Sequence, residues 1–170
     1  MEEEIAGIEL ERAHPRAVQI IPDDFFWDCT DELAPFGSDE GDTALSEFRD
    51  WRQENPDAPV EACLIWTIEG VGEIDVSEYD DAIFDEATVA AQINDPDFDD
   101  QQLIYTTDVS VIATAFGQLA DEGKIDASAK PYALRALKRQ EVWARLQPGW
   151  EHAGEYLRNL ARLKSALAQA

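Results

Sequence analysis

Hydrophobic residues along most of this chain recur at the three- and four-residue spacings that place them on one side of a helix. In the clearest case, the apolar positions between Val109 and Ala120 share a face, and Gly123 follows where a helix is expected to end. The sequence is therefore predicted to be mainly helical. We expect helices over residues 43–54, 58–69, 77–93, 108–122, 128–146 and 150–167.

Three shorter segments are less regular and decide the fold class. Residues 16–21 alternate roughly and predict one short strand, and residues 102–106 are expected to be extended. Residues 71–76 are compatible with a strand or a loop, because Gly70 and Gly72 weaken a strand. The predicted fold class is mainly α, a single-domain helical fold over residues 1–170, with an α+β fold containing one small sheet or hairpin as the alternative.

The helix predicted over residues 58–69 is apolar on nearly every side. Helices of this kind are usually buried in a protein interior. We therefore expect Cys63 and Trp66, which both fall on this helix, to be core residues.

Charge is distributed unevenly along the chain, which carries 37 acidic and 13 basic residues and a net charge of −24. Residues 1–123 form an acidic body with a net charge of −29, and residues 124–170 form a mildly basic helical part with a net charge of +5. Such a charge repels nucleic-acid phosphates and attracts a basic protein. We expect no direct nucleic-acid partner, although acidity also favours solubility and is typical of high-salt habitats.

Targeting and membrane signals are not evident in the sequence. No apolar run approaches the roughly 20 residues of a membrane helix, and the first residues, Met-Glu-Glu-Glu, lack the basic start of a signal peptide. We expect a cytoplasmic protein with no membrane partner.

The loop over residues 25–42 combines aromatic side chains with closely spaced carboxylates and is the predicted interaction site. Carboxylate oxygens are also ligands for hard cations, but the spacing is not that of a known calcium loop. The residues predicted to bind a basic partner are Trp27, Asp28, Asp31, Glu32, Phe36, Asp39 and Asp42.

No catalytic motif accompanies this loop. Cys29 lies among acids, which disfavour a reactive thiolate, and His152 and Glu155 lack the second half of a di-iron motif. Gly70 and Gly72 belong to neither a phosphate-binding loop nor a dinucleotide fold. The sequence therefore predicts no catalytic residue, no metal ligand and no cofactor.

The segment FFWDCTDELAPFGSDEGDTAL, together with Phe48, Arg49, Asp50 and Trp51, resembles a block found in the YfeS-like uncharacterised bacterial proteins. The resemblance rests chiefly on the pattern WD…DE.APFGSD.G. It implies a bacterial cytoplasmic protein in which this loop matters, and it carries no established activity.

Charge and loop together favour an acidic, non-enzymatic protein-binding module, such as an inhibitor or immunity-type antagonist of a basic partner, for example a nuclease. One alternative is a metal-assisted hydrolase that uses the acids of residues 28–42. Another is a structural or regulatory subunit whose basic C-terminal helices dock on an acidic surface.

Overall fold

The computed structural model describes residues 7–170, and every regular element among these residues is helical. The α-helices are α1 (Pro15–Ile20), α2 (Asp39–Glu54), α3 (Val60–Gly72), α4 (Glu86–Asn94), α5 (Thr107–Glu122), α6 (Lys130–Arg145) and α7 (Ala153–Gln169). The shorter helical turns are η1 (Leu10–Arg12), η2 (Asp24–Trp27), η3 (Val76–Glu78), η4 (Asp81–Phe84) and the π-helical η5 (Gln101–Thr106).

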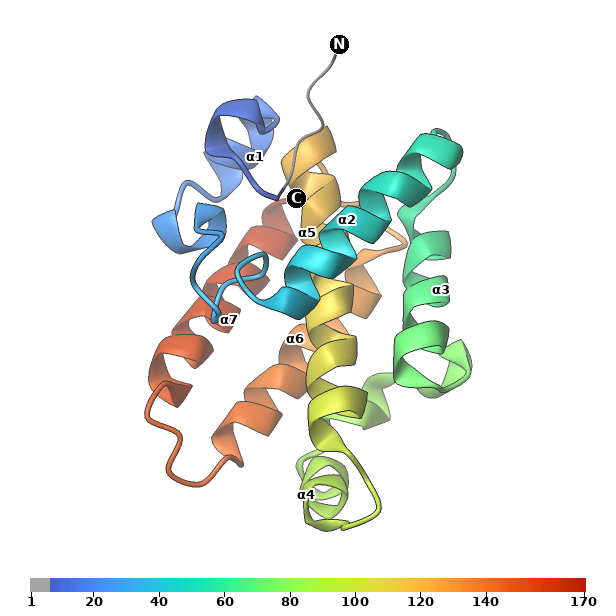
Figure 1. Ribbon diagram of the computed structural model, residues 1–170, viewed down its shortest axis with the longest axis vertical. Coiled ribbons are helices and arrows are strands. Elements are labelled where there is room, and N and C mark those ends of the chain that lie inside the picture. The colour runs from blue at the N-terminus through green and yellow to red at the C-terminus, as the bar shows by residue number, and fades with distance from the viewer. Residues whose placement is uncertain (1–6) are drawn as a thin grey trace.

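Helix α5 runs through the centre of the fold (Figure 1). Every residue from Thr107 to Ala120 is buried, because α2, α3 and α6 pack directly against this helix. Helix α7 packs on α6, and α3 lies at an outer edge of the molecule with α5 on its inner side. The mainly α fold class is therefore confirmed.

Large apolar side chains from distant segments meet around α5. The Phe26 ring lies edge-on to Phe36 at 5.3 Å and to Phe116 at 5.9 Å between ring centroids. Such aromatic pairs stabilise beyond their buried area. The loop that precedes α2 is thereby attached to the centre of the protein.

The three predicted helices nearest the C-terminus correspond to α5, α6 and α7. Gly123 ends α5 in the left-handed conformation, with φ 77°, which glycine adopts without the steric cost of a Cβ. Pro131 lies in the first turn of α6, where its missing N–H would have no helical partner.

The predicted small sheet is wrong for residues 7–170, which contain no strand. Residues 16–21 instead lie largely in α1, because Pro15 starts a helix and the His14 ring accepts a hydrogen bond from Arg16 N. Helix α3 continues through Gly70 and Gly72 and ends at Glu73, whose φ is 56°. Local turn signals were outweighed by packing of α3 against α5.

One predicted extended segment and the starts of three predicted helices also need correction. Residues 102–106 belong to the π-helix η5, which continues into α5, so Asp108 lies inside a helix rather than at the start predicted for the helix over residues 108–122. Helix α2 begins earlier than predicted because Ser38 accepts a hydrogen bond from Gly41 N. Residues 77–93 are divided between η3, η4 and α4, and α4 starts where Asp85 accepts from Thr88 N.

Candidate protein-interaction surface

Of the two aromatic residues in the predicted binding site, Phe36 is buried in the core and Trp27 is half-buried. Phe36 is only 1% exposed and belongs to the core, so it does not supply the surface anchor expected of it. Trp27 is half-buried, and its indole Nε1 donates to the carbonyl oxygen of Ile21 at 2.8 Å. Both rings contact Phe26, and their burial stabilises the loop.

The predicted carboxylates lie at the surface, and several also stabilise turns. Asp28 accepts hydrogen bonds from Thr30 Oγ1 and Thr30 N, which lower the pKa of its carboxyl group. Asp31 accepts from Leu33 N at 2.9 Å. Asp39 and Asp42 are exposed in the first turn of α2, where the positive end of the helix dipole favours negative charge.

Two glycines explain why this loop has so distinctive a sequence. A Cβ on Gly37 would collide with the carbonyl oxygen of Asp31, and one on Gly41 would collide with that of Pro35. Backbone approaches this close leave no room for any side chain. The APFGSD.G pattern thus specifies a tightly folded loop, with Ser38 capping the helix that follows.

The carboxylates named for the metal-assisted alternative are spread over the loop of residues 25–38 and the first turn of α2. No group of three or more His, Cys, Asp or Glu side chains within residues 7–170 converges in a way that would hold an ion. Cys29 is exposed, whereas Cys63 is buried, and burial raises the pKa of the Cys63 thiol to about 11.

A buried polar network that sequence reasoning missed joins α5, α6 and α7. Arg139 donates Nε and Nη2 to the Asp108 carboxylate at 2.8 Å, and Gln140 and Tyr79 donate to the same carboxylate at 2.9 and 2.6 Å. Tyr156 donates to Gln140 Oε1 at 2.6 Å. The sequence signal was a charged residue among the apolar positions of each of two amphipathic helices.

The pKa values of three network groups are raised, which keeps both tyrosines and the arginine protonated. Burial raises the pKa of Tyr79 and of Tyr156 well above the usual value for tyrosine, and the negative charge of Asp108 acts in the same direction. For Arg139, burial opposes charge, but Asp108 outweighs it and raises the pKa of the guanidinium group. The network is enclosed by the core and fixes how the helices pack.

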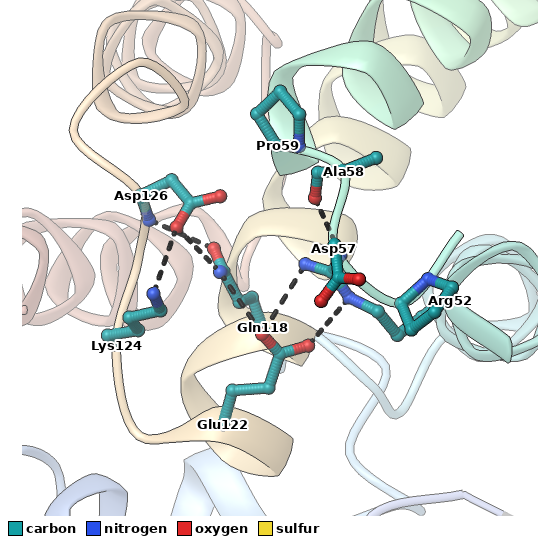
Figure 2. A pocket seen from close by; sticks show the side chains of 9 residues that line it. Arg52, Asp57, Ala58, Pro59, Gln118, Glu122, Lys124 and Asp126 are labelled. Atoms are coloured by element: carbon teal, nitrogen blue, oxygen red, sulfur yellow. Dashed lines mark hydrogen bonds and ion pairs between the residues drawn. The ribbon is translucent and has the colours of Figure 1, made fainter.

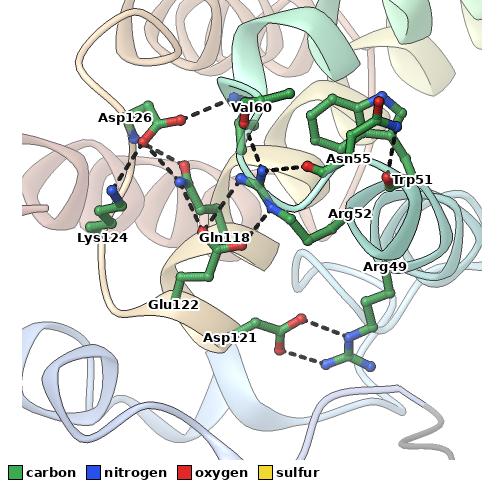
Figure 3. Close-up of polar contacts among 11 residues, drawn as sticks. Arg49, Trp51, Arg52, Asn55, Val60, Gln118, Asp121, Glu122, Lys124 and Asp126 are labelled. Atoms are coloured by element: carbon green, nitrogen blue, oxygen red, sulfur yellow. Dashed lines mark hydrogen bonds and ion pairs between the residues drawn. The ribbon is translucent and has the colours of Figure 1, made fainter.

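An open polar cleft of about 400 Å³ lies where the α2–α3 turn meets the α5–α6 connection (Figure 2). Arg52 donates Nε to Glu122 at 2.9 Å and Nη1 to the carbonyl oxygens of Asn55 and Ala58. These contacts join the end of α2 and its following turn to the end of α5 (Figure 3).

Asp126 completes this junction from the α5–α6 connection. Its carboxylate accepts from Val60 N at 3.0 Å, so it caps α3 from a distant part of the chain, and from Gln118 Nε2 at 2.9 Å. Partial burial acts to raise the pKa of Asp126, but these hydrogen bonds outweigh it and lower the pKa. The cleft is lined by groups that hold one another in place (Figures 2 and 3).

Basic side chains are largely engaged within the protein. At least eight of the thirteen Lys and Arg residues form ion pairs, which include Arg135 with Asp81 and Arg162 with Asp23. The basic C-terminal helices thus contact the chain's own acidic body. Residues 53–123 contain no Lys, Arg or His, and most acids of residues 73–100 are exposed.

Trp66 departs from the expectation that it is a core residue. Cys63, on the inner side of α3, is buried as predicted, but Trp66 is 56% exposed. Among the described residues, Leu10 is the other large hydrophobic side chain with substantial exposure, at 43%.

Among residues 7–170, one helical stretch is long and apolar enough, by length and composition, to cross a membrane. It covers Gln101–Glu122, that is η5 and α5, and 83% of its most apolar window is buried inside the protein. It forms the central helix of the core described above.

The fold and surface define an acidic, helical protein with one continuous core around α5. Its sequence is 32% identical over 148 residues to the Uncharacterized protein YfeS of Escherichia coli (strain K12), an alignment that covers 85% of this chain and 57% of the relative. The chain is thus YfeS-like, as the loop sequence indicated, and it spans little more than half of that relative's length. No protein-family profile and no solved structure matches the chain.

Proposed function

We propose that this chain is an acidic, non-enzymatic protein-binding module whose partner is a basic protein. The observation that carries the proposal is the uncompensated negative surface, because most cations of the chain are already paired inside it while its acids outnumber them. An acidic surface of this size accelerates association with a cationic protein and slows association with nucleic acid.

The exposed loop carboxylates contribute to this attraction in the proposal. Asp28 and Glu32 are exposed and Asp31 is half-buried on a loop whose backbone packs closely at Gly37 and Gly41, and Asp39 and Asp42 are exposed in the first turn of α2. A rigid loop loses little conformational entropy when a partner binds. An inhibitor or immunity-type antagonist of a basic enzyme such as a nuclease would use an acidic surface in this way.

Affinity capture at low salt from a bacterial lysate, followed by association kinetics with the purified captured protein, tests the proposal. The variants are Asp39→Lys/Asp42→Lys and the milder Asp39→Asn/Asp42→Asn, with helix content and Tm compared to show that each is folded. The proposal expects one basic protein to be captured, with an association rate that falls with added salt and falls further in each variant, most in the charge reversal. An association rate that is indifferent to salt and to both variants would contradict it.

A further inference from the structure

One face of α3 is left uncovered although the helix is apolar nearly all round. The inner side carries the buried residues Val60, Leu64 and Ile68 and packs against α5. Its outer side lies at the edge of the molecule in Figure 1. The outer face, at helical spacing, consists of Ala62, Ile65, Trp66, Glu69, Gly70 and Glu73.

Trp66 is the dominant feature of this face. Its side chain is more than half exposed, whereas helices that are apolar on all sides are normally covered on all sides. Tryptophan is also among the residues most enriched where protein interfaces concentrate their binding energy. The indole is therefore a large hydrophobic group that the rest of the chain covers only in part.

Gly70 lies one helical turn beyond Trp66 and has no explanation in the packing of this chain. A Cβ placed on it meets no atom within 4 Å, whereas one on Gly72, on the inner side of α3, would lie 3.2 Å from Thr107 Cγ2. Glycine inside a helix lowers stability relative to alanine. Because Gly70 has no side chain and its position is open, the helix surface beside the Trp66 indole has room for a side chain of a partner.

The negative charge of this face indicates which kind of partner fits it. Glu69 and Glu73 are exposed on it, and the nearest basic residues in the sequence are Arg52 and Lys124. A second copy of this chain, with its net charge of −24, would be repelled. A segment with apolar side chains for Trp66 and cations for the two glutamates fits both requirements.

We propose that the outer face of α3 is a docking surface for a basic amphipathic helix of a partner protein, with Trp66 as its apolar anchor. The inference rests on the proposed function and deepens it by naming the surface and the form of the partner segment. The partner helix lays its apolar stripe over Trp66 and Gly70 and places lysine or arginine beside Glu69 and Glu73.

Two synthetic helical peptides test the inference on the full chain. One carries leucine along one side and lysine along the other, and the second keeps every lysine but has glutamine in place of leucine. The variants are Trp66→Ala and, as a matched control, Leu10→Ala, which removes the other exposed large hydrophobic side chain. Binding is measured by titration calorimetry at low and at moderate salt.

The expected result is that the leucine-containing peptide binds wild type about tenfold more tightly than the glutamine peptide. Trp66→Ala removes this difference, and Leu10→Ala retains it. Equal binding of the leucine peptide to wild type and Trp66→Ala overturns the docking surface but leaves the proposed function standing. Failure of wild type to bind either peptide at low salt instead counts against the proposed function itself.

Gly70→Leu provides a second test, because a loss of peptide binding in a variant with an unchanged or raised Tm is not explained by unfolding. Because the position is open and leucine favours helix more than glycine, the variant is expected to keep or raise its Tm. A bulky side chain beside Trp66 is expected to weaken binding of the leucine peptide at the same time. A stable Gly70→Leu variant with unchanged affinity would also overturn the inference.

Discussion

Arg139 and Asp108 form an ion pair at the centre of the fold, where Arg139 is 4% exposed and Asp108 is completely buried. Two guanidinium nitrogens of Arg139 donate to the carboxylate, and Gln140 and Tyr79 supply further donors. A buried pair of this kind is costly to break from one side, because the remaining charge stays buried without compensation.

We therefore expect Arg139→Met to lower the free energy of unfolding by about 3–5 kcal/mol. Asp108→Asn should also destabilise, and the double variant should cost at least about 1 kcal/mol less than the sum of the single variants. Urea denaturation of the four proteins measures this coupling. Single-variant effects that simply add would show that the two residues do not act as a pair.

Gly37 marks a second requirement of the fold, because its Cβ position coincides with the backbone of Asp31. Gly37→Ala must displace that backbone, and we expect it to destabilise the protein by about 2 kcal/mol or more. Gly70→Ala is the matched control, since its Cβ meets open space, and it should stabilise by about 0.5–1 kcal/mol. Thermal unfolding of both variants checks this; equal Tm changes would contradict the close approach in the loop.

Asp126 makes stability depend on pH through its contact with the start of α3. The pKa of Asp126 in the folded protein is lowered from its ordinary value of 3.8, so its stabilising contribution is present above that value and is lost as pH falls through the folded pKa. Asp126→Asn should therefore cost about 1 kcal/mol near neutral pH and show a shallower loss of stability in acid. Asp57→Asn, at an exposed acid of the same cleft, is the control.

The prediction is tested by measuring the free energy of unfolding of these two variants and of wild type between pH 7 and about pH 2. If the stability of Asp126→Asn falls in acid as steeply as that of wild type, the hydrogen bond from Val60 N to Asp126 contributes nothing to the pH dependence.

The C-terminal helices are expected to be indispensable for folding. Leu137 of α6 and Leu160 of α7 are fully buried, and α6 packs directly against α5. Removing all residues after Gly123 exposes one side of α5 and should abolish cooperative unfolding. Circular dichroism during a thermal scan tests this. A sharp unfolding transition in the truncated chain would contradict the prediction, because it would show that the chain folds without α6 and α7.

Hydrophobic periodicity by itself determined that the protein is mainly helical, and local signals located the ends of α5, α6 and α7. These features depend on residues close in sequence, such as Gly123 after the last apolar position of α5. The loop resemblance also indicated the YfeS-like relationship, because a tight loop with Gly37 and Gly41 imposes its own residue pattern.

Only the tertiary structure decided which apolar and charged residues lie inside. Phe36 and Trp66 are both large aromatic residues. Phe36 packs against Phe26 in the core, whereas Trp66 is more than half exposed on the outer face of α3. Asp108 has the local pattern of a helix cap, but η5 extends the helix before it and Arg139, 31 residues away, supplies its counter-charge. Burial and charge pairing depend on contacts between distant segments, which periodicity along the chain does not encode.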